Sequence, residues 1–232
     1  KIYPGRPLQL NHFKIFAPPP RELIRNIEFD LLKEPREEFN IDTFREKFLH
    51  IQGNILLSGG FELATYFINY EDQIRQEFTL KDPISELSRI WAKKILDDTM
   101  PISIHVRRGD YLTEDNSKIF YKLPMNYYEH CVEILRENFP QMSLYIFSDD
   151  LDWCRKNFNF GVPTYFVDAN DEDHGFEDMF LMSLCRHHVI ANSTFSWWGA
   201  WLDNRVGNLT FVPEPFIGLS RKQWIVVEFE GY

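Results

Sequence analysis

The chain has 232 residues, and its 25 lysines and arginines against 35 aspartates and glutamates give a formal net charge of −10 at pH 7. A chain this acidic is a poor general binder of nucleic acids or anionic membranes, whose phosphates attract a basic surface. Its 21 Phe, 10 Tyr and 6 Trp supply enough apolar area for a core, which excludes intrinsic disorder. No apolar stretch approaches the roughly 18 residues of a membrane-spanning helix.

The first 80 residues carry few signals of regular structure. The prolines at 18–20 interrupt the chain, and the charged stretch 21–45 gives mixed helical signals. A short strand is predicted over 54–58, and a helix over 71–78.

From residue 82 onward, the pattern alternates between helix and strand. Asp82 and Pro83 suit the N-cap and first position of a helix whose apolar face includes Leu87, Ile90 and Ile95. Further helices are predicted to begin near residues 124, 150, 176 and 195, and strands are predicted over 102–106, 144–147, 164–167, 188–191 and 209–212. This alternation predicts an α/β fold with a parallel sheet covered by helices on both faces.

The three cysteines, Cys131, Cys154 and Cys185, lie far apart in helical patterns and lack the spacing of metal ligands. We interpret them as buried thiols of a protein in a reducing compartment.

Polar side chains gather where the predicted strands end. The carboxyl ends of parallel strands share one edge of a sheet, where ligands bind. Arg107 and Arg108 follow the first of these strands and can bind a diphosphate in bidentate fashion. Ser193 and Thr194 precede a helix, so their hydroxyls and the free amides of the helix start form a second anion site. Alternatives at these positions are surface ion pairs for the arginines and simple capping for the hydroxyls.

Other polar residues near this edge allow more than one interpretation. His105 ends a buried strand and fits an ordinary core position, and Asp178 lies in a first helical turn, where the dipole favours an acid. Residues 150–152 (DLD) and 171–173 (DED) fit a metal–diphosphate DxD pattern, which arises easily among 35 acids. Residues 108–110 (RGD) match a cell-adhesion tripeptide, which we treat as a coincidence.

Several blocks, in this order, resemble the α-1,2-fucosyltransferase family. They are residues 105–112 (HVRRGDYL), residues 147–150 (FSDD) followed by Trp153 and Cys154, residues 181–185 (LMSLC), and residues 190–202 (IANSTFSWWGAWL). The resemblance covers roughly residues 50–215 and is specific because the blocks occur together and in order.

The resemblance implies a GT-B glycosyltransferase with two facing Rossmann-like domains. Residues 1–80 would form the smaller, acceptor-side α/β domain, and residues 81–232 the Rossmann-like domain that binds GDP-fucose. The donor would be GDP-β-L-fucose and the acceptor the 2-hydroxyl of a terminal galactose. Transfer would invert the anomeric carbon, with no essential metal and no separate cofactor.

The resemblance also implies roles for individual residues. It places Arg107 at the β-phosphate, His105 and Asp178 at guanine, and Asp150, Ser193 and Thr194 at the ribose and phosphates, with Arg108 in the same turn as Arg107. A general base is expected in the loop that follows, and Asp110 is preferred over Glu114 and Asp115 because the turn at Gly109 fixes its position.

Two competing hypotheses remain open. One is a metal-dependent glycosyltransferase that uses Asp150 and Asp152, and the other is a non-catalytic nucleotide-sugar-binding or adhesion module. The Gly-rich segment with which the family begins has no counterpart before Lys81, so the N-terminal domain is expected to lack its first elements. A glycosylation tripeptide at Asn192 would place a glycan in the donor site, which favours a cytoplasmic protein, peripheral to a membrane where glycan acceptors are assembled.

Overall fold

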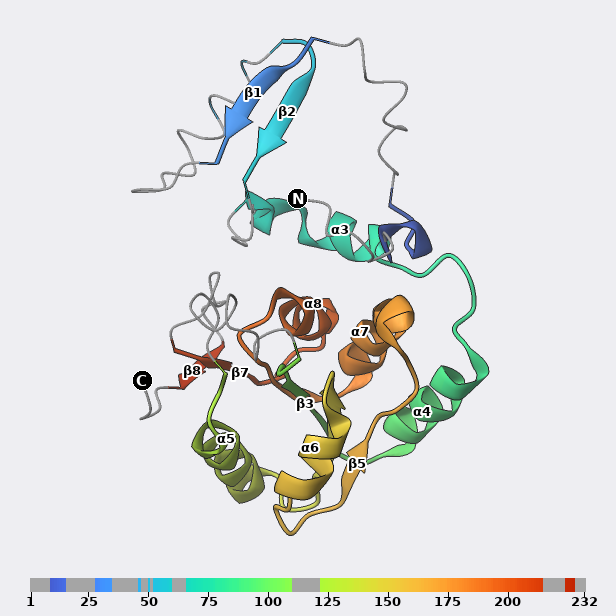
Figure 1. The fold of residues 1–232 in the computed structure, drawn as a ribbon, viewed down its shortest axis with the longest axis vertical. Helices are drawn as coiled ribbons and strands as arrows, with labels where there is room; N and C mark the ends of the chain where they lie inside the picture. The colour runs from blue at the N-terminus through green and yellow to red at the C-terminus, as the bar shows by residue number, and fades with distance from the viewer. Residues whose placement is uncertain are drawn as a thin grey trace.

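Two parallel sheets organise the chain (Figure 1). The computed structural model describes residues 9–15, 28–34, 46, 50, 52–59, 66–109, 122–214 and 224–227. The smaller sheet pairs β1 (Asp30–Lys33) with β2 (Ile55–Ser58). Strand β2 confirms the prediction over 54–58, whereas β1 lies in the charged stretch, whose pattern indicates only mixed helical structure.

The larger sheet has six parallel strands in the order β5-β4-β3-β6-β7-β8. They are β3 (Pro101–Val106), β4 (Ser143–Ser148), β5 (Thr164–Phe166), β6 (His187–Val189), β7 (Thr210–Pro213) and β8 (Ile225–Val227). This is the Rossmann strand order. Successive strands β3, β4 and β5 are added toward one side of the sheet, and β6, β7 and β8 are added toward the other side, so the strand order reverses between β3 and β6. The predicted α/β class with a Rossmann-like parallel sheet is therefore confirmed, and β8 is an additional strand that the sequence did not predict.

Helices cover both faces of the larger sheet. The helical segments are η1 (Gln9–His12), η3 (Ile68–Tyr70), α3 (Glu71–Glu77), α4 (Glu86–Asp97), α5 (Met125–Asn138), α6 (Leu151–Asn157), η6 (Glu172–His174), α7 (Gly175–Leu184) and α8 (Thr194–Leu202). Helices α5 and α6 pack in one apolar cluster with Ile104 and Ile146, while α4 and α7 share another with Tyr145 and Phe147. Because neighbouring residues of β4 belong to opposite clusters, this strand is apolar on both faces, as expected in a covered parallel sheet.

Helix α4 begins later than the sequence predicts. Its N-cap is Ser85, whose hydroxyl accepts a hydrogen bond from the Ser88 amide at 3.2 Å, so Asp82 and Pro83 lie before the helix. The Ser85 amide and hydroxyl both donate to the buried carboxylate of Glu177 in α7, at 3.0 and 2.7 Å. This long-range contact fixes the start of the helix, which a local capping pattern could not reveal.

The apolar face predicted for α4 is also wrong in part. Leu87 and Ile90 are exposed, while Ser88, Ala92 and Ile95 form the buried side of the helix. The hydroxyl of Ser88 donates to Asn170 Oδ1 at 3.2 Å, so a small polar residue outside the predicted apolar face occupies part of the buried side.

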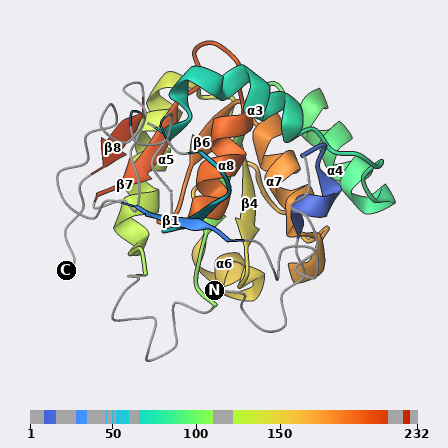
Figure 2. The same cartoon turned by 90° about the horizontal axis from the view of Figure 1, so that it is seen from above.

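Segments from the first 80 residues pack against α7 and α8 (Figure 2). The Trp198 ring of α8 stacks against both Phe67 and Phe78, with ring centroids 5.6 and 4.7 Å apart. The Arg75 guanidinium of α3 lies 4.0 Å from the centre of the Trp201 ring and donates to the Trp201 carbonyl at 3.1 Å. Helix α3, which the sequence predicts over 71–78, thereby covers the helix that begins at Ser193 and Thr194.

A buried polar network joins the two central strands to the end of α8. Ser103 Oγ of β3 lies 2.8 Å from His188 Nδ1 of β6, and His188 Nε2 lies 3.1 Å from Asp203 Oδ2. The arrangement resembles a hydrolytic triad, but the Ser103 and His188 residues are wholly buried, so the contacts bind structural elements together. The three cysteines are buried free thiols, as predicted. In the part of the chain that the structure describes, no helix is long and apolar enough to cross a bilayer.

Candidate donor site

The register of the sheet places the predicted anion-binding segments at neighbouring strand ends. Val106 of β3 pairs with Ser148 of β4, and Ile104 pairs with Val189 of β6. The arginine turn, the acids after β4 and the start of α8 therefore follow three adjacent strands. The point between β3 and β6, where strand order reverses, is where open α/β sheets bind ligands.

Asp149 holds the arginine turn together. Its Oδ1 accepts a hydrogen bond from the Arg108 amide at 2.8 Å, and its Oδ2 accepts one from the Gly109 amide at 3.0 Å. The same Oδ2 lies 2.9 Å from Arg107 Nη1. Arg107 is thus paired with Asp149, and Arg108 is paired with Asp150. This agrees with the alternative interpretation that the two arginines form ion pairs, but both acids lie directly after the neighbouring strand β4.

The Arg108 side chain contacts two residues of the segment that follows β4. Its Nε donates to Asp150 Oδ2 at 3.0 Å, and its guanidinium lies 3.8 Å from the centre of the Trp153 ring. Asp150 also caps α6, because its Oδ1 accepts the Trp153 amide at 3.1 Å. The hydrogen bond from Arg108 is the main reason that the pKa of Asp150 lies below its ordinary value. Asp150 is therefore a charged positioning group at this edge.

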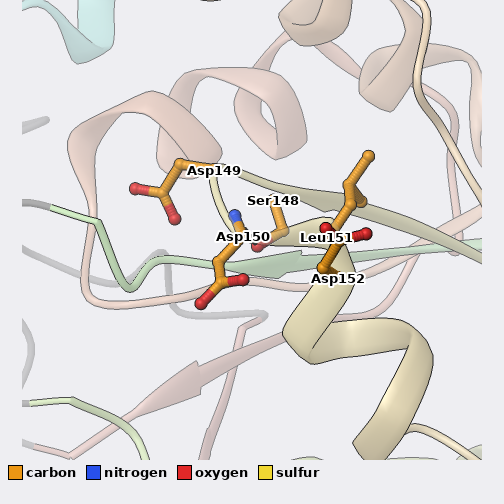
Figure 3. Close-up of a pocket in the computed structure, with 5 residues that line it drawn as sticks. All are labelled: Ser148, Asp149, Asp150, Leu151 and Asp152. Carbon is orange, nitrogen blue, oxygen red and sulfur yellow. Dashed lines mark hydrogen bonds between the residues drawn. The ribbon is translucent and has the colours of Figure 1, made fainter.

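A pocket of about 350 Å³ opens beside these acids (Figure 3). It is lined by residues 148–152, which form the end of β4 and the first turn of α6. In Figure 3, Asp149 and Asp150 lie at the turn that joins the strand to the helix. The pocket therefore adjoins the arginine turn, whose amides and guanidinium groups contact these acids.

Ser193 and Thr194 lie at the start of α8. Ser193 is the N-cap residue, yet its side chain makes no capping hydrogen bond, which disfavours simple capping as the role of its hydroxyl. Ser193 is half-buried and Thr194 is exposed. The start of a helix combines free backbone amides with the positive end of the helix dipole, so this position can receive an anion.

His105 lies one strand position before Val106 and is 4% exposed. Its ring lies 5.3 Å from the Phe195 ring in the first turn of α8, which connects the ends of β3 and β6. Burial and the nearby charge of Arg107 lower the pKa of His105 to about 3, so the ring is neutral at pH 7. Within the described residues, its buried Nδ1 atom has no hydrogen-bond partner.

Of the residues whose positions the structure describes, Asp178 of α7 contacts Asn170 and not the residues that directly follow β3 and β4. Asn170, which follows β5, donates to Asp178 Oδ1 at 2.6 Å and accepts from Ser88 of α4. Burial raises the pKa of Asp178 to about 6, although the hydrogen bond from Asn170 opposes this shift. Burial therefore makes ionisation of the Asp178 carboxyl group less favourable than in water.

The remaining sequence hypotheses have different outcomes. Asp110, the candidate general base, lies outside the described residues, as do Glu114 and Asp115. The two acids of the DLD pattern pair with different arginines: Asp152 with Arg155 at 3.1 Å and Asp150 with Arg108 at 3.0 Å. Among the residues with described positions, no group of three or more His, Cys, Asp or Glu could hold a metal ion. Asp149 was missed as a site residue because its role depends on the β3–β4 register, although its place in the FSDD block was a usable signal.

Arginines and a helix start that follow adjacent strands of a Rossmann-ordered sheet are an arrangement found in α/β proteins that bind nucleotides. Residues 9–225 match the model of glycosyl transferase family 11, and the chain belongs to this family.

Three curated relatives illustrate the match. An O-antigen biosynthesis glycosyltransferase of Escherichia coli is 32% identical over 78% of this chain and 61% of its own length. An alpha-1,2-colitosyltransferase of the same species is 31% identical over 85% of this chain and 69% of its own. A galactoside alpha-(1,2)-fucosyltransferase 2 of Rattus norvegicus is 25% identical over 82% of this chain and 57% of its own. The chain thus spans about three-fifths of the length of the curated relatives it matches.

Proposed function

We propose that this protein transfers L-fucose from GDP-β-L-fucose to the 2-hydroxyl of a terminal galactose, with inversion at the anomeric carbon. The observation that carries the proposal is the arginine turn that follows β3, the strand adjacent to β6, after which the chain leads into α8. Membership of glycosyl transferase family 11 supports group transfer from an activated sugar. The rat relative named a galactoside alpha-(1,2)-fucosyltransferase supports the choice of sugar and linkage.

The chemical task is to stabilise the GDP leaving group while an acceptor hydroxyl attacks the opposite face of the sugar. Negative charge grows on the β-phosphate as the glycosidic bond breaks, and the sugar gains oxocarbenium character. In the proposed mechanism, Arg107 binds the β-phosphate, with Arg108 supporting the turn. The hydroxyls of Ser193 and Thr194 and the first amides of α8 bind the remaining phosphate oxygens.

The other donor contacts follow from the chemistry of GDP. We assign Asp178, together with the neutral His105, to guanine, because a carboxylate can accept both N–H groups of the guanine edge. Asp150 is assigned to the ribose, since it already lies at the edge of the sheet beside Arg108. Asp110 is the proposed general base that receives the proton of the attacking hydroxyl.

The proposal predicts transfer without a metal ion. Arg107 supplies the positive charge that a divalent cation supplies in DxD enzymes. Transfer from GDP-fucose to a terminal galactoside should therefore retain at least half of its rate in EDTA, measured by released GDP and by the linkage of the product. Loss of transfer in EDTA, restored by Mn²⁺ and abolished in Asp150→Asn/Asp152→Asn, would establish the metal-dependent alternative. GDP binding without turnover would favour the binding-module alternative.

The transferred sugar is tested in the same assay. GDP-colitose should be offered in parallel, because one relative is named an alpha-1,2-colitosyltransferase. A kcat/KM at least tenfold higher for GDP-fucose supports the proposal, whereas the reverse preference would reassign the donor sugar and leave the nucleotide site unchanged.

The raised pKa of Asp178 gives the proposal a pH dependence. Guanine requires the carboxylate form, so protonation below the pKa of about 6 should weaken GDP binding. The apparent affinity should be nearly constant above pH 7 and roughly tenfold weaker at pH 5. Calorimetric titrations over pH 5–8 measure this, and Asp178→Asn should bind GDP weakly with that pH-dependent component removed. An unchanged affinity in a folded Asp178→Asn protein would show that this residue does not contact guanine.

The cellular setting is also a proposal. Buried free thiols fit a cytoplasmic protein, and the galactose-terminated acceptor would be met where glycans are assembled at a membrane.

A further inference from the structure

The Asp149 carboxylate makes three contacts with the arginine turn. Its two oxygens receive the Arg108 amide, the Gly109 amide and Arg107 Nη1, at 2.8, 3.0 and 2.9 Å. Its side chain is 18% exposed, so these interactions are partly shielded from solvent. One acid directly after β4 thus fixes both the backbone and a side chain of the turn that follows β3.

The absence of a side chain at Gly109 allows the Asp149 carboxylate to approach the turn this closely. A Cβ atom at Gly109 would lie 2.8 Å from Asp149 Oδ2 and 3.2 Å from Asp149 Cγ. Its three nearest neighbours would all be atoms of Asp149. A side chain at this position would therefore displace the Asp149 carboxylate from the turn.

We propose that Asp149 is the positioning residue that sets the arginine turn for the donor diphosphate, acting through Arg107 and the backbone of Arg108 and Gly109. A guanidinium carries its N–H donors in a rigid planar fork, so a carboxylate that holds one nitrogen also sets the direction of the others. The inference rests on the proposed function, because the turn is useful only if a diphosphate binds there. Asp149 itself does not contact the donor.

Asp149→Asn tests this role with little change in shape. The amide keeps one accepting oxygen but presents an NH₂ group to a second donor and removes the charge paired with Arg107. We expect the Kd for GDP to rise at least tenfold and kcat/KM for GDP-fucose to fall by more, while the KM for the acceptor stays within twofold. The matched control is Asp168→Asn, because Asp168 follows β5 and pairs with Arg155 at 3.4 Å. This control should bind GDP within twofold of the parent.

A double-mutant cycle separates positioning from general destabilisation. Asp149→Asn should weaken GDP binding by a clearly smaller factor in an Arg107→Ala background than in the parent, because its contact with Arg107 is already absent and only its contacts with the Arg108 and Gly109 amides remain. Additive losses would overturn the inference. If Asp149→Asn does not fold, Gly109→Ala serves instead, because its added methyl group displaces the carboxylate. It should weaken GDP binding at least tenfold, and unchanged binding would overturn the inference.

The two proposals fail in different ways. A parent protein that does not bind GDP would refute the proposed function and the inference together. A parent that binds GDP, with a folded Asp149→Asn variant that binds it equally well, would refute only the role of Asp149.

Discussion

Arg107→Ala should lower the rate of fucosyl transfer by about a hundredfold to a thousandfold, while the protein remains folded. The expected size follows from the loss of one preorganised donor to a developing negative charge, which costs about 2.7–4 kcal/mol in the transition state. Arg107→Lys should recover little of this, because an ammonium cannot reproduce the planar fork that Asp149 orients. Steady-state kinetics with GDP-fucose measures both effects.

Two comparisons make the Arg107 result interpretable. Arg155→Lys is a matched control. Arg155 belongs to α6, pairs with the exposed carboxylates of Asp152 and Asp168, and has no role in the proposed site. It should leave kcat/KM within twofold of the parent. Transfer by Arg107→Lys within a few-fold of the parent would show that a point charge suffices and that the bidentate role is wrong.

Asp203→Ala should lower the free energy of unfolding by about 3–5 kcal/mol, as expected when one partner of a buried charged network is removed. Asp203 Oδ1 accepts from Arg205 Nε at 2.7 Å, and its Oδ2 contacts His188 and Asn208. Arg205 in turn donates to the carbonyls of Ser183, Leu184 and Cys185, which end α7. Removing the carboxylate therefore leaves His188 without this partner and releases the arginine that caps a helix.

The same network predicts the direction of acid destabilisation. Burial alone would raise the pKa of Asp203, but hydrogen bonds from His188 and Arg205 hold it well below its ordinary value. Its stabilising contribution is thus present above about pH 4 and is lost as pH falls toward the lower pKa of the folded state. Urea unfolding at pH 7 and at pH 3 measures this, and Asp203→Ala should lose less stability over that range than the parent.

Asp97→Ala is the control for the Asp203 prediction, because its carboxylate forms an exposed ion pair with Lys93. Its unfolding free energy should change by no more than about 1 kcal/mol. A similarly small change in the unfolding free energy of Asp203→Ala would mean that the buried contacts of Asp203 contribute little to stability.

The arginine turn and the start of α8 could be predicted because each follows a short apolar run that is interpretable without its partners. The rule that parallel strands end at one edge then brings Arg107 and Ser193 to the same region. The role of Asp149 could not be predicted in this way, since it depends on Val106 pairing with Ser148 in the sheet. Likewise, the start of α4 depends on Glu177, which is remote in sequence.

Other differences between prediction and structure have similar physical causes. Strand β1 lies among charged residues and keeps Leu31 exposed, so it shows little of the apolar alternation that predicts strands. The contacts among Ser103, His188 and Asp203 join three separate parts of the chain, so no local pattern reveals them. The division of the chain at residue 80 stays a prediction.

Calorimetric titration of the protein with GDP, UDP and CMP tests whether the edge between β3 and β6 is a guanosine diphosphate site. We expect GDP to bind at least tenfold more tightly than UDP or CMP, in EDTA as well as in Mg²⁺, and Arg107→Ala to reduce the GDP affinity strongly. Equal affinities for GDP and UDP, or GDP binding unaffected by Arg107→Ala, would contradict this expectation.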